Sequence, residues 1–222
     1  WKISALGGPH ISLEQKIISE FNARHAGRCV IETLEIKAAT VEEIHSAASL
    51  ITGPLHVFIE IPISDDPLPL LQALREHKLR AKVRTGGITP EAFPRSDHLA
   101  RFISSCYSVG VPFKATAGLH HPLRGSYRLT YAPGSERTTM FGFLNVLIAA
   151  ALARQGAPID TLIDVLEEDS LDAFRFEDTG AAWRSHRFNN DVIRDMRDEG
   201  MLSFGSCSFR EPIDELREMK LT

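Results

Sequence analysis

The chain has 222 residues, of which 43% are hydrophobic and 24% are charged. This is an ordinary globular composition, and the length is enough for one large domain or two small ones. Its formal net charge is −4, and it contains no run rich in lysine and arginine. General binding of nucleic acid, which requires a basic surface, is therefore excluded.

Apolar runs typical of strands alternate with helical patterns along the first 118 residues. The chain begins with a strand-like run, and the helix after it has Ser12 as its expected N-cap and Gln15 at the capping-box position. Such alternation predicts right-handed βαβ units and a parallel sheet. We expect strands over 1–8, 29–39, 54–63, 79–87 and 111–118, and helices over 12–25, 40–51, 66–78 and 96–110.

The pattern becomes helical after residue 118, with helices predicted over 140–156 and 159–168. We therefore expect residues 119–200 to form a helical insertion within a single domain that spans 1–222. The stretch from Met140 to Ala153 has too much apolar surface to remain in water, so it should pack on a barrel end or on a second copy in a homodimer. A sixth strand over 201–209 and a last helix over 211–220 complete the prediction.

Polar residues within the predicted strands distinguish between two parallel architectures. The strands of an open doubly wound sheet are almost purely apolar, whereas a (β/α)8 barrel directs polar side chains from its strand ends into one mouth. Five of the predicted strands carry such groups, so we favour the barrel. Six strands leave it two short, and we expect its first two strands to precede this chain. The polar groups are Glu35, Lys37, Glu60, Lys82, Arg84, Lys114, Thr116, Ser206 and Cys207.

Four strand sequences, HVFIEIPI, LRAKVRTGG, VPFKATAG and LSFGSCSF, together resemble the last four strands of deoxyribose-phosphate aldolase and its relatives, class I aldolases that fold as (β/α)8 barrels. VRTGG after Lys82 resembles the motif of the Schiff-base lysine, and ATAG after Lys114 resembles that of a second lysine. The resemblance covers about residues 1–118 and 201–210. It implies that Lys82 forms an imine, that Lys114 tunes its pKa, and that Glu35 or Glu60 moves protons, without a cofactor.

Elementary chemistry leaves two interpretations of these lysines open. A lysine attacks a carbonyl only when it is deprotonated, and a second cation nearby lowers its pKa towards neutrality. Lys82 and Lys114 on adjacent strands would provide such a pair. Alternatively, the lysines form ion pairs with Glu35 and Glu60 in a structural polar layer inside the barrel.

Small and cationic residues at the strand ends are candidates for binding an anionic substrate, since backbone N–H groups and arginine side chains there can face a phosphate or carboxylate. The stretch LHHPLRG adds an acid–base or substrate-contact histidine and an anion clamp, unless it serves loop packing. Adjacent histidines in an extended segment point to opposite sides, so no metal ion is predicted there. The substrate-binding candidates are Lys37, Arg84, Thr85, Gly86, Gly87, Thr116, Gly118, His120, Arg124, Gly205 and Ser206.

The sequence thus predicts an aldolase-like lyase that forms a Schiff base with a small anionic carbonyl compound, in particular a phosphorylated one. The alternatives are a lyase or isomerase that stabilises an enolate without a covalent intermediate, and a barrel that binds an anion without catalysis. The chain has three cysteines, an odd number that does not suggest a framework of disulfides. We therefore expect the protein in a reducing compartment, the cytoplasm. No apolar run is long enough to span a bilayer, so no membrane partner is expected.

Overall fold

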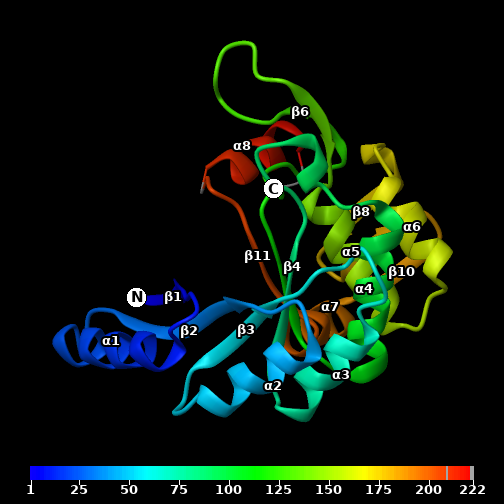
Figure 1. Ribbon diagram of the computed structural model, residues 1–222. Helices are drawn as coiled ribbons and strands as arrows, with labels where there is room; N and C mark the ends of the chain where they lie inside the picture. Colours follow the sequence, from blue (N-terminus) through cyan, green and yellow to red (C-terminus); the bar gives the residue numbers. More distant parts are fainter. Residues whose placement is uncertain (209, 221–222) are drawn as a thin grey trace.

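Six parallel strands form a curled sheet, a half-barrel, at the centre of the computed structural model, which describes residues 1–208 and 210–220 (Figure 1). The order of the strands in the sheet is β1-β2-β3-β4-β5-β11, so the predicted α/β class and parallel sheet are confirmed. The described residues stop at this half-barrel and do not close into eight strands. The strands are β1 (Lys2–Leu6), β2 (Val30–Lys37), β3 (His56–Glu60), β4 (Arg80–Arg84), β5 (Phe113–Thr116) and β11 (Met201–Gly205).

Helices cover the convex face of the sheet. Apolar residues that alternate with the charged ones along the strands, such as Leu34, Ile59 and Val83, are buried on this face. Phe113 of β5 makes an edge contact with Phe102 of α4, with ring centroids 5.4 Å apart. The apolar core therefore lies on the convex side of the sheet. Because successive side chains of a strand point to opposite faces, the charged residues between these apolar ones lie on the concave side. The helices here are α1 (Ile11–Arg24), α2 (Val41–Leu50), α3 (Leu68–Glu76) and α4 (Ser96–Val109).

The predicted helix ends are partly right. Thr40 caps α2, because its Oγ1 accepts a hydrogen bond from the Glu43 N–H at 3.2 Å. The cap predicted at Ser12 is wrong, because α1 begins at Ile11 without a side-chain cap. Gln15 instead links α1 to the end of α2: its amide donates to the Leu50 carbonyl at 2.8 Å. A tertiary contact has thus replaced the local capping interaction.

The insertion between β5 and β11 holds short strands as well as helices, so the purely helical prediction for 119–200 was incomplete. Strands of four residues are too short to establish a clear alternation in sequence. A hairpin pairs β6 (Gly125–Arg128) with β7 (Arg137–Met140), and a three-stranded antiparallel sheet joins β8 (Phe174–Glu177), β9 (Gly180–Trp183) and β10 (His186–Asn189). The helices are α5 (Phe143–Arg154), α6 (Ile159–Glu167) and α7 (Asn190–Glu199). Two short 3-10 turns, η1 (Pro90–Ala92) and η2 (Leu171–Ala173), and α8 (Glu211–Glu218) complete the fold.

The apolar helix α5 is buried within the chain. It packs against α4, α6 and α7, and the ring of its first residue, Phe143, stacks on Phe204 of β11 with centroids 5.0 Å apart. The expected covering of this apolar surface is therefore provided by the chain's own elements. Among the described residues, no helix combines the length and the apolar character needed to cross a membrane. The strand predicted over 201–209 ends at Gly205, and Phe209 lies outside the described residues.

Candidate functional site

A row of charged residues crosses the concave face of the sheet. Lys37 of β2 is in register with Glu60 of β3, Glu60 with Lys82 of β4, and Lys82 with Lys114 of β5. Residues in register on parallel strands point to the same face, and Glu35, two residues before Lys37, shares that face. The parallel pairing thus gathers onto one surface residues that are as many as 79 positions apart in the chain.

Glu35, Glu60, Lys82 and Lys114 form a connected ion-pair network, which we call the lysine–glutamate network. The Lys82 Nζ lies 2.9 Å from Glu35 Oε2 and 2.9 Å from Glu60 Oε2. Lys114 donates a hydrogen bond to Glu35 Oε1 at 2.6 Å, and its Nζ also lies 5.2 Å from the centre of the Phe58 ring. Lys82 is only 6% exposed, so its ammonium group has exchanged water for two carboxylates.

The network favours the charged forms of its members. Burial by itself lowers the pKa of Lys82, but the contacts with Glu60 and Glu35 outweigh burial and raise the pKa of Lys82 above its ordinary value. Burial likewise raises the pKa of Glu35, but Lys114 and Lys82 outweigh it and lower the pKa of Glu35 overall. The expectation that a neighbouring lysine lowers the pKa of Lys82 is therefore wrong for this resting state, because two carboxylates contact its ammonium group directly.

These shifts predict a specific loss of stability in acid. A carboxyl whose pKa is lower in the folded chain stabilises it above the unfolded pKa, near 4.5 for Glu35, and this contribution disappears as the pH falls through the lower folded value. Urea unfolding of the parent and of Glu35→Gln between about pH 3 and pH 7 should therefore show a free-energy difference that shrinks in acid. A difference that stays constant or grows towards low pH would contradict the assigned pairing.

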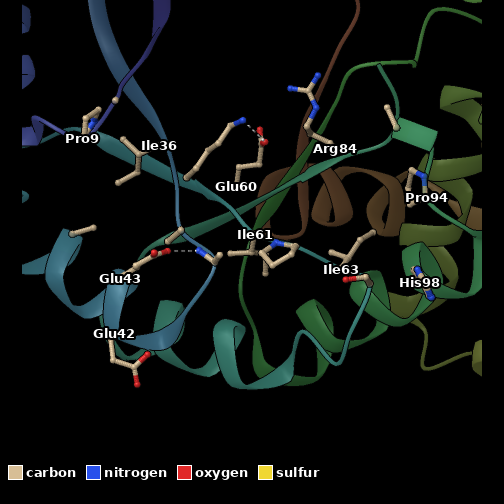
Figure 2. Close-up of a pocket in the computed structure, with 18 of the residues that line it drawn as sticks. Pro9, Ile36, Glu42, Glu43, Glu60, Ile61, Ile63, Arg84, Pro94 and His98 are labelled. Atoms are coloured by element: carbon tan, nitrogen blue, oxygen red, sulfur yellow. Dashed lines mark hydrogen bonds and ion pairs between the residues drawn. The ribbon is translucent and has the colours of Figure 1, made fainter. Parts of the chain in front are cut away.

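A cavity of about 1100 Å³ opens beside the network (Figure 2). Glu60 lines it and is the link to the network, since its carboxylate contacts Lys82 on one oxygen and Lys37, at 3.4 Å, on the other. The exposed Arg84, at the end of β4, lines the same cavity. One wall comes from α2, including Glu43, and another from residues 91–98. The cavity is therefore lined by three cationic side chains, Lys37, Arg84 and Arg95, and by four carboxylates, of which that of Glu60 belongs to the network.

The small residues at the strand ends serve packing. Thr85 is fully buried, and its hydroxyl donates to the Ala117 carbonyl at 2.5 Å. A Cβ atom on Gly86 would lie 2.4 Å from the Phe93 ring, and one on Gly118, where φ is +75°, would lie 2.8 Å from it. A Cβ on Gly87 would lie 2.7 Å from Ala92. The glycines allow η1 to approach β4 and β5, and their predicted role in binding an anion through backbone N–H groups stays a prediction.

A second polar group forms where β5 and β11 end. His120 Nδ1 lies 3.1 Å from Ser206 Oγ and 3.6 Å from the sulfur of the exposed Cys207. Burial, together with the neighbouring His121, lowers the pKa of His120 despite the opposing effect of Glu211. This contact between an imidazole and a cysteine sulfur joins residues 87 positions apart, so local sequence patterns could not reveal it. His120 and Ser206 are therefore brought together, but they do not line the cavity beside Glu60.

The remaining candidates are Arg124, Thr116 and Gly205. Arg124 contacts Ser96 Oγ at 3.3 Å and lines a separate cavity of about 400 Å³ between η1 and β7, so the structure does not join it to the site. Thr116 follows Lys114 on the concave face, and Gly205 packs beside it, with 3.7 Å between a Cβ built on Gly205 and the Thr116 methyl. The two residues are in register on β5 and β11.

Comparisons with family models, with curated proteins and with solved structures found no match to this chain. The resemblance to deoxyribose-phosphate aldolase therefore stays a prediction.

Proposed function

We propose that the protein binds a small anionic carbonyl compound in the cavity beside Glu60 and catalyses proton transfer at the carbon next to the carbonyl, without a covalent intermediate. The observation that supports this most is the Lys82 ammonium group held between Glu35 and Glu60 at 2.9 Å from each. A lysine in this setting is protonated and cannot attack a carbonyl, but it can orient the carboxylate that faces the cavity.

In this reaction Glu60 is the base, and Arg84 and Lys37 provide positive charge. Glu60 would accept the proton from the carbon, and the electron pair left behind would move onto the carbonyl oxygen as an enolate. Arg84 and Lys37 line the same cavity and supply positive charge for that oxygen or for an anionic group of the substrate. A lyase and an isomerase would share this first step and differ in the fate of the enolate.

A second candidate is the Schiff-base aldolase that the resemblance implies. The register of Lys82 beside Lys114 on adjacent strands favours it, since both lysine motifs then occupy the expected neighbouring positions. In that mechanism Lys82 first loses a proton to Glu35 or Glu60, and its free amine then condenses with the carbonyl, releasing water.

Binding can be tested with a panel of phosphorylated aldehydes, ketones and 2-oxo acids, by calorimetry and by ligand-dependent thermal stabilisation. Arg84→Met should raise the dissociation constant of the best ligand by about tenfold or more, because a charge-assisted hydrogen bond is lost. Arg217→Met, on α8 and outside the cavity lining, is the matched control and should bind like the parent. Equal affinity in the parent and in Arg84→Met would reject this cavity as the anion site.

Treatment with borohydride, which reduces and so traps an imine, distinguishes the covalent mechanism from the non-covalent one. For the non-covalent mechanism we expect hydrogen–deuterium exchange at the substrate carbon in heavy water. The mass of the protein should not increase after borohydride treatment with the substrate. A mass increase on Lys82, lost in Lys82→Met, would instead identify the Schiff-base aldolase. Ligand binding without exchange or trapping would leave only the anion-binding function.

A further inference from the structure

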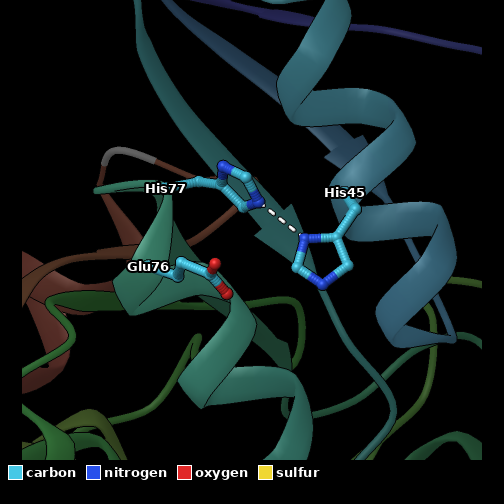
Figure 3. Close-up of side chains that lie close together, drawn as sticks. All are labelled: His45, Glu76 and His77. Carbon is cyan, nitrogen blue, oxygen red and sulfur yellow. Dashed lines mark hydrogen bonds between the residues drawn. The ribbon is translucent and has the colours of Figure 1, made fainter.

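Two exposed histidines and an exposed glutamate come together between α2 and the end of α3 (Figure 3), and none of the three lines the cavity. His45 lies on α2, Glu76 is the last residue of α3, and His77 follows it. Their side chains are exposed, and one ligand atom from each lies within 4.8 Å of the others. His45 Nδ1 and His77 Nε2 are hydrogen-bonded at 2.7 Å, so a potential ligand nitrogen of each imidazole already lies beside that of the other.

We propose that His45, Glu76 and His77 form a binding site for a divalent transition-metal ion, with zinc as the best-matched ion, that clamps α2 to α3. Neutral imidazole nitrogens are good ligands for zinc, nickel and copper, whereas magnesium and calcium prefer shells of oxygen. Three protein ligands leave a tetrahedral zinc ion one position for water.

The two histidines need only a small adjustment to accept the ion. Tetrahedral zinc with bonds of 2.0–2.1 Å holds two ligand nitrogens about 3.3 Å apart, slightly more than in the hydrogen-bonded pair of imidazoles. Both rings are on the surface and nearly perpendicular, with an interplanar angle of 75°, so side-chain rotation can open the gap without disturbing the core. Glu42 lies close enough to His45 for their charges to interact, which adds negative charge beside the site.

The position of the site suggests what the ion does. Helix α2 forms a wall of the cavity through Glu43 and Ser46, while its other side packs against α3. An ion that joins His45 to His77 would fix that wall to the neighbouring helix. It would stabilise the folded chain because the three ligands converge only after α2 and α3 have packed together. Metal binding at His45, Glu76 and His77 does not require that the reaction proposed for the cavity takes place.

Zinc titration of the purified chain against a chromophoric zinc indicator tests the site. His45→Ala and His77→Ala should each weaken zinc binding at this site by at least tenfold, and Glu76→Gln should weaken it severalfold. His10→Ala, an exposed histidine before α1, is the matched control and should bind zinc like the parent. Zinc should raise the melting temperature of the parent and of His10→Ala more than that of His45→Ala.

A second group with metal-binding residue types requires a separate variant. His121, Glu211 and Glu215 also place their ligand atoms within 4.8 Å of one another, so His121→Ala distinguishes the two positions. Copper bound to the parent should show an electron paramagnetic resonance spectrum with two imidazole nitrogens, and with one in His77→Ala. Zinc affinity that survives both His45→Ala and His77→Ala, or that is lost on His121→Ala instead, would overturn the proposal, as would the absence of zinc binding at micromolar concentrations.

Discussion

Lys82→Met is expected to lower the free energy of unfolding by about 3–5 kcal/mol at neutral pH, because it removes the cation shared by two buried carboxylates. Methionine matches the length of the lysine stem, so lost packing contributes little. Glu35 keeps its contact with Lys114, but Glu60 is left with Lys37, whose side chain is 75% exposed. Urea denaturation of the parent and the variant measures the difference.

Two companion variants show whether charge is the cause. Lys37→Met breaks only the exposed pair with Glu60 and should cost about 0–1 kcal/mol. Adding Glu60→Gln to Lys82→Met removes one of the stranded charges, so part of the lost stability should return. A loss below about 1 kcal/mol for Lys82→Met would mean that water or protons readily compensate the two carboxylates. The network would then be no more than a solvated cluster.

The alternation of strands and helices could be predicted because each element is governed by local rules. Every strand of the central sheet was expected within a few residues of its place, and the parity of polar residues indicated that Lys82 and Lys114 share a face. Their ion pairs depend on register between strands, which is set by parallel pairing once the order of strands is known. This part of the candidate site was therefore accessible from the sequence.

The features that could not be predicted depend on contacts between distant segments. The sequence left two interpretations of Lys82 open, a cation pair with Lys114 or ion pairs with Glu35 and Glu60. Only the packed sheet shows that both carboxylates contact its ammonium group, so the expected lowering of its pKa was wrong. The sequence also does not indicate that Phe93 packs closely on Gly86 and Gly118. The cavity wall of α2 and the His45–His77 pair likewise require the packing of helices that are separate in the chain.

Glu60→Gln is expected to reduce the rate of substrate hydrogen–deuterium exchange by about 10²–10⁴-fold, which is the usual contribution of a positioned general base. The amide keeps the size of the carboxylate and a carbonyl oxygen towards Lys82, but it cannot accept the proton. Because Arg84 still supplies the charge that binds the anion, KM should change far less than kcat. Exchange is measured by nuclear magnetic resonance in heavy water, with unfolding measured on the same samples to establish that the variant is folded.

Glu43→Gln is the matched control for this last experiment. Glu43 lines the same cavity from α2, but its carboxylate accepts a hydrogen bond from the Ala39 N–H at 2.6 Å and lies outside the lysine–glutamate network. Glutamine retains that acceptor, so exchange should remain close to the parent rate. Equal losses in both variants would mean that the cavity needs negative charge in general, and parent-like exchange in Glu60→Gln would exclude Glu60 as the base. Only a loss confined to Glu60→Gln links proton transfer to the one carboxylate that joins the cavity to Lys82.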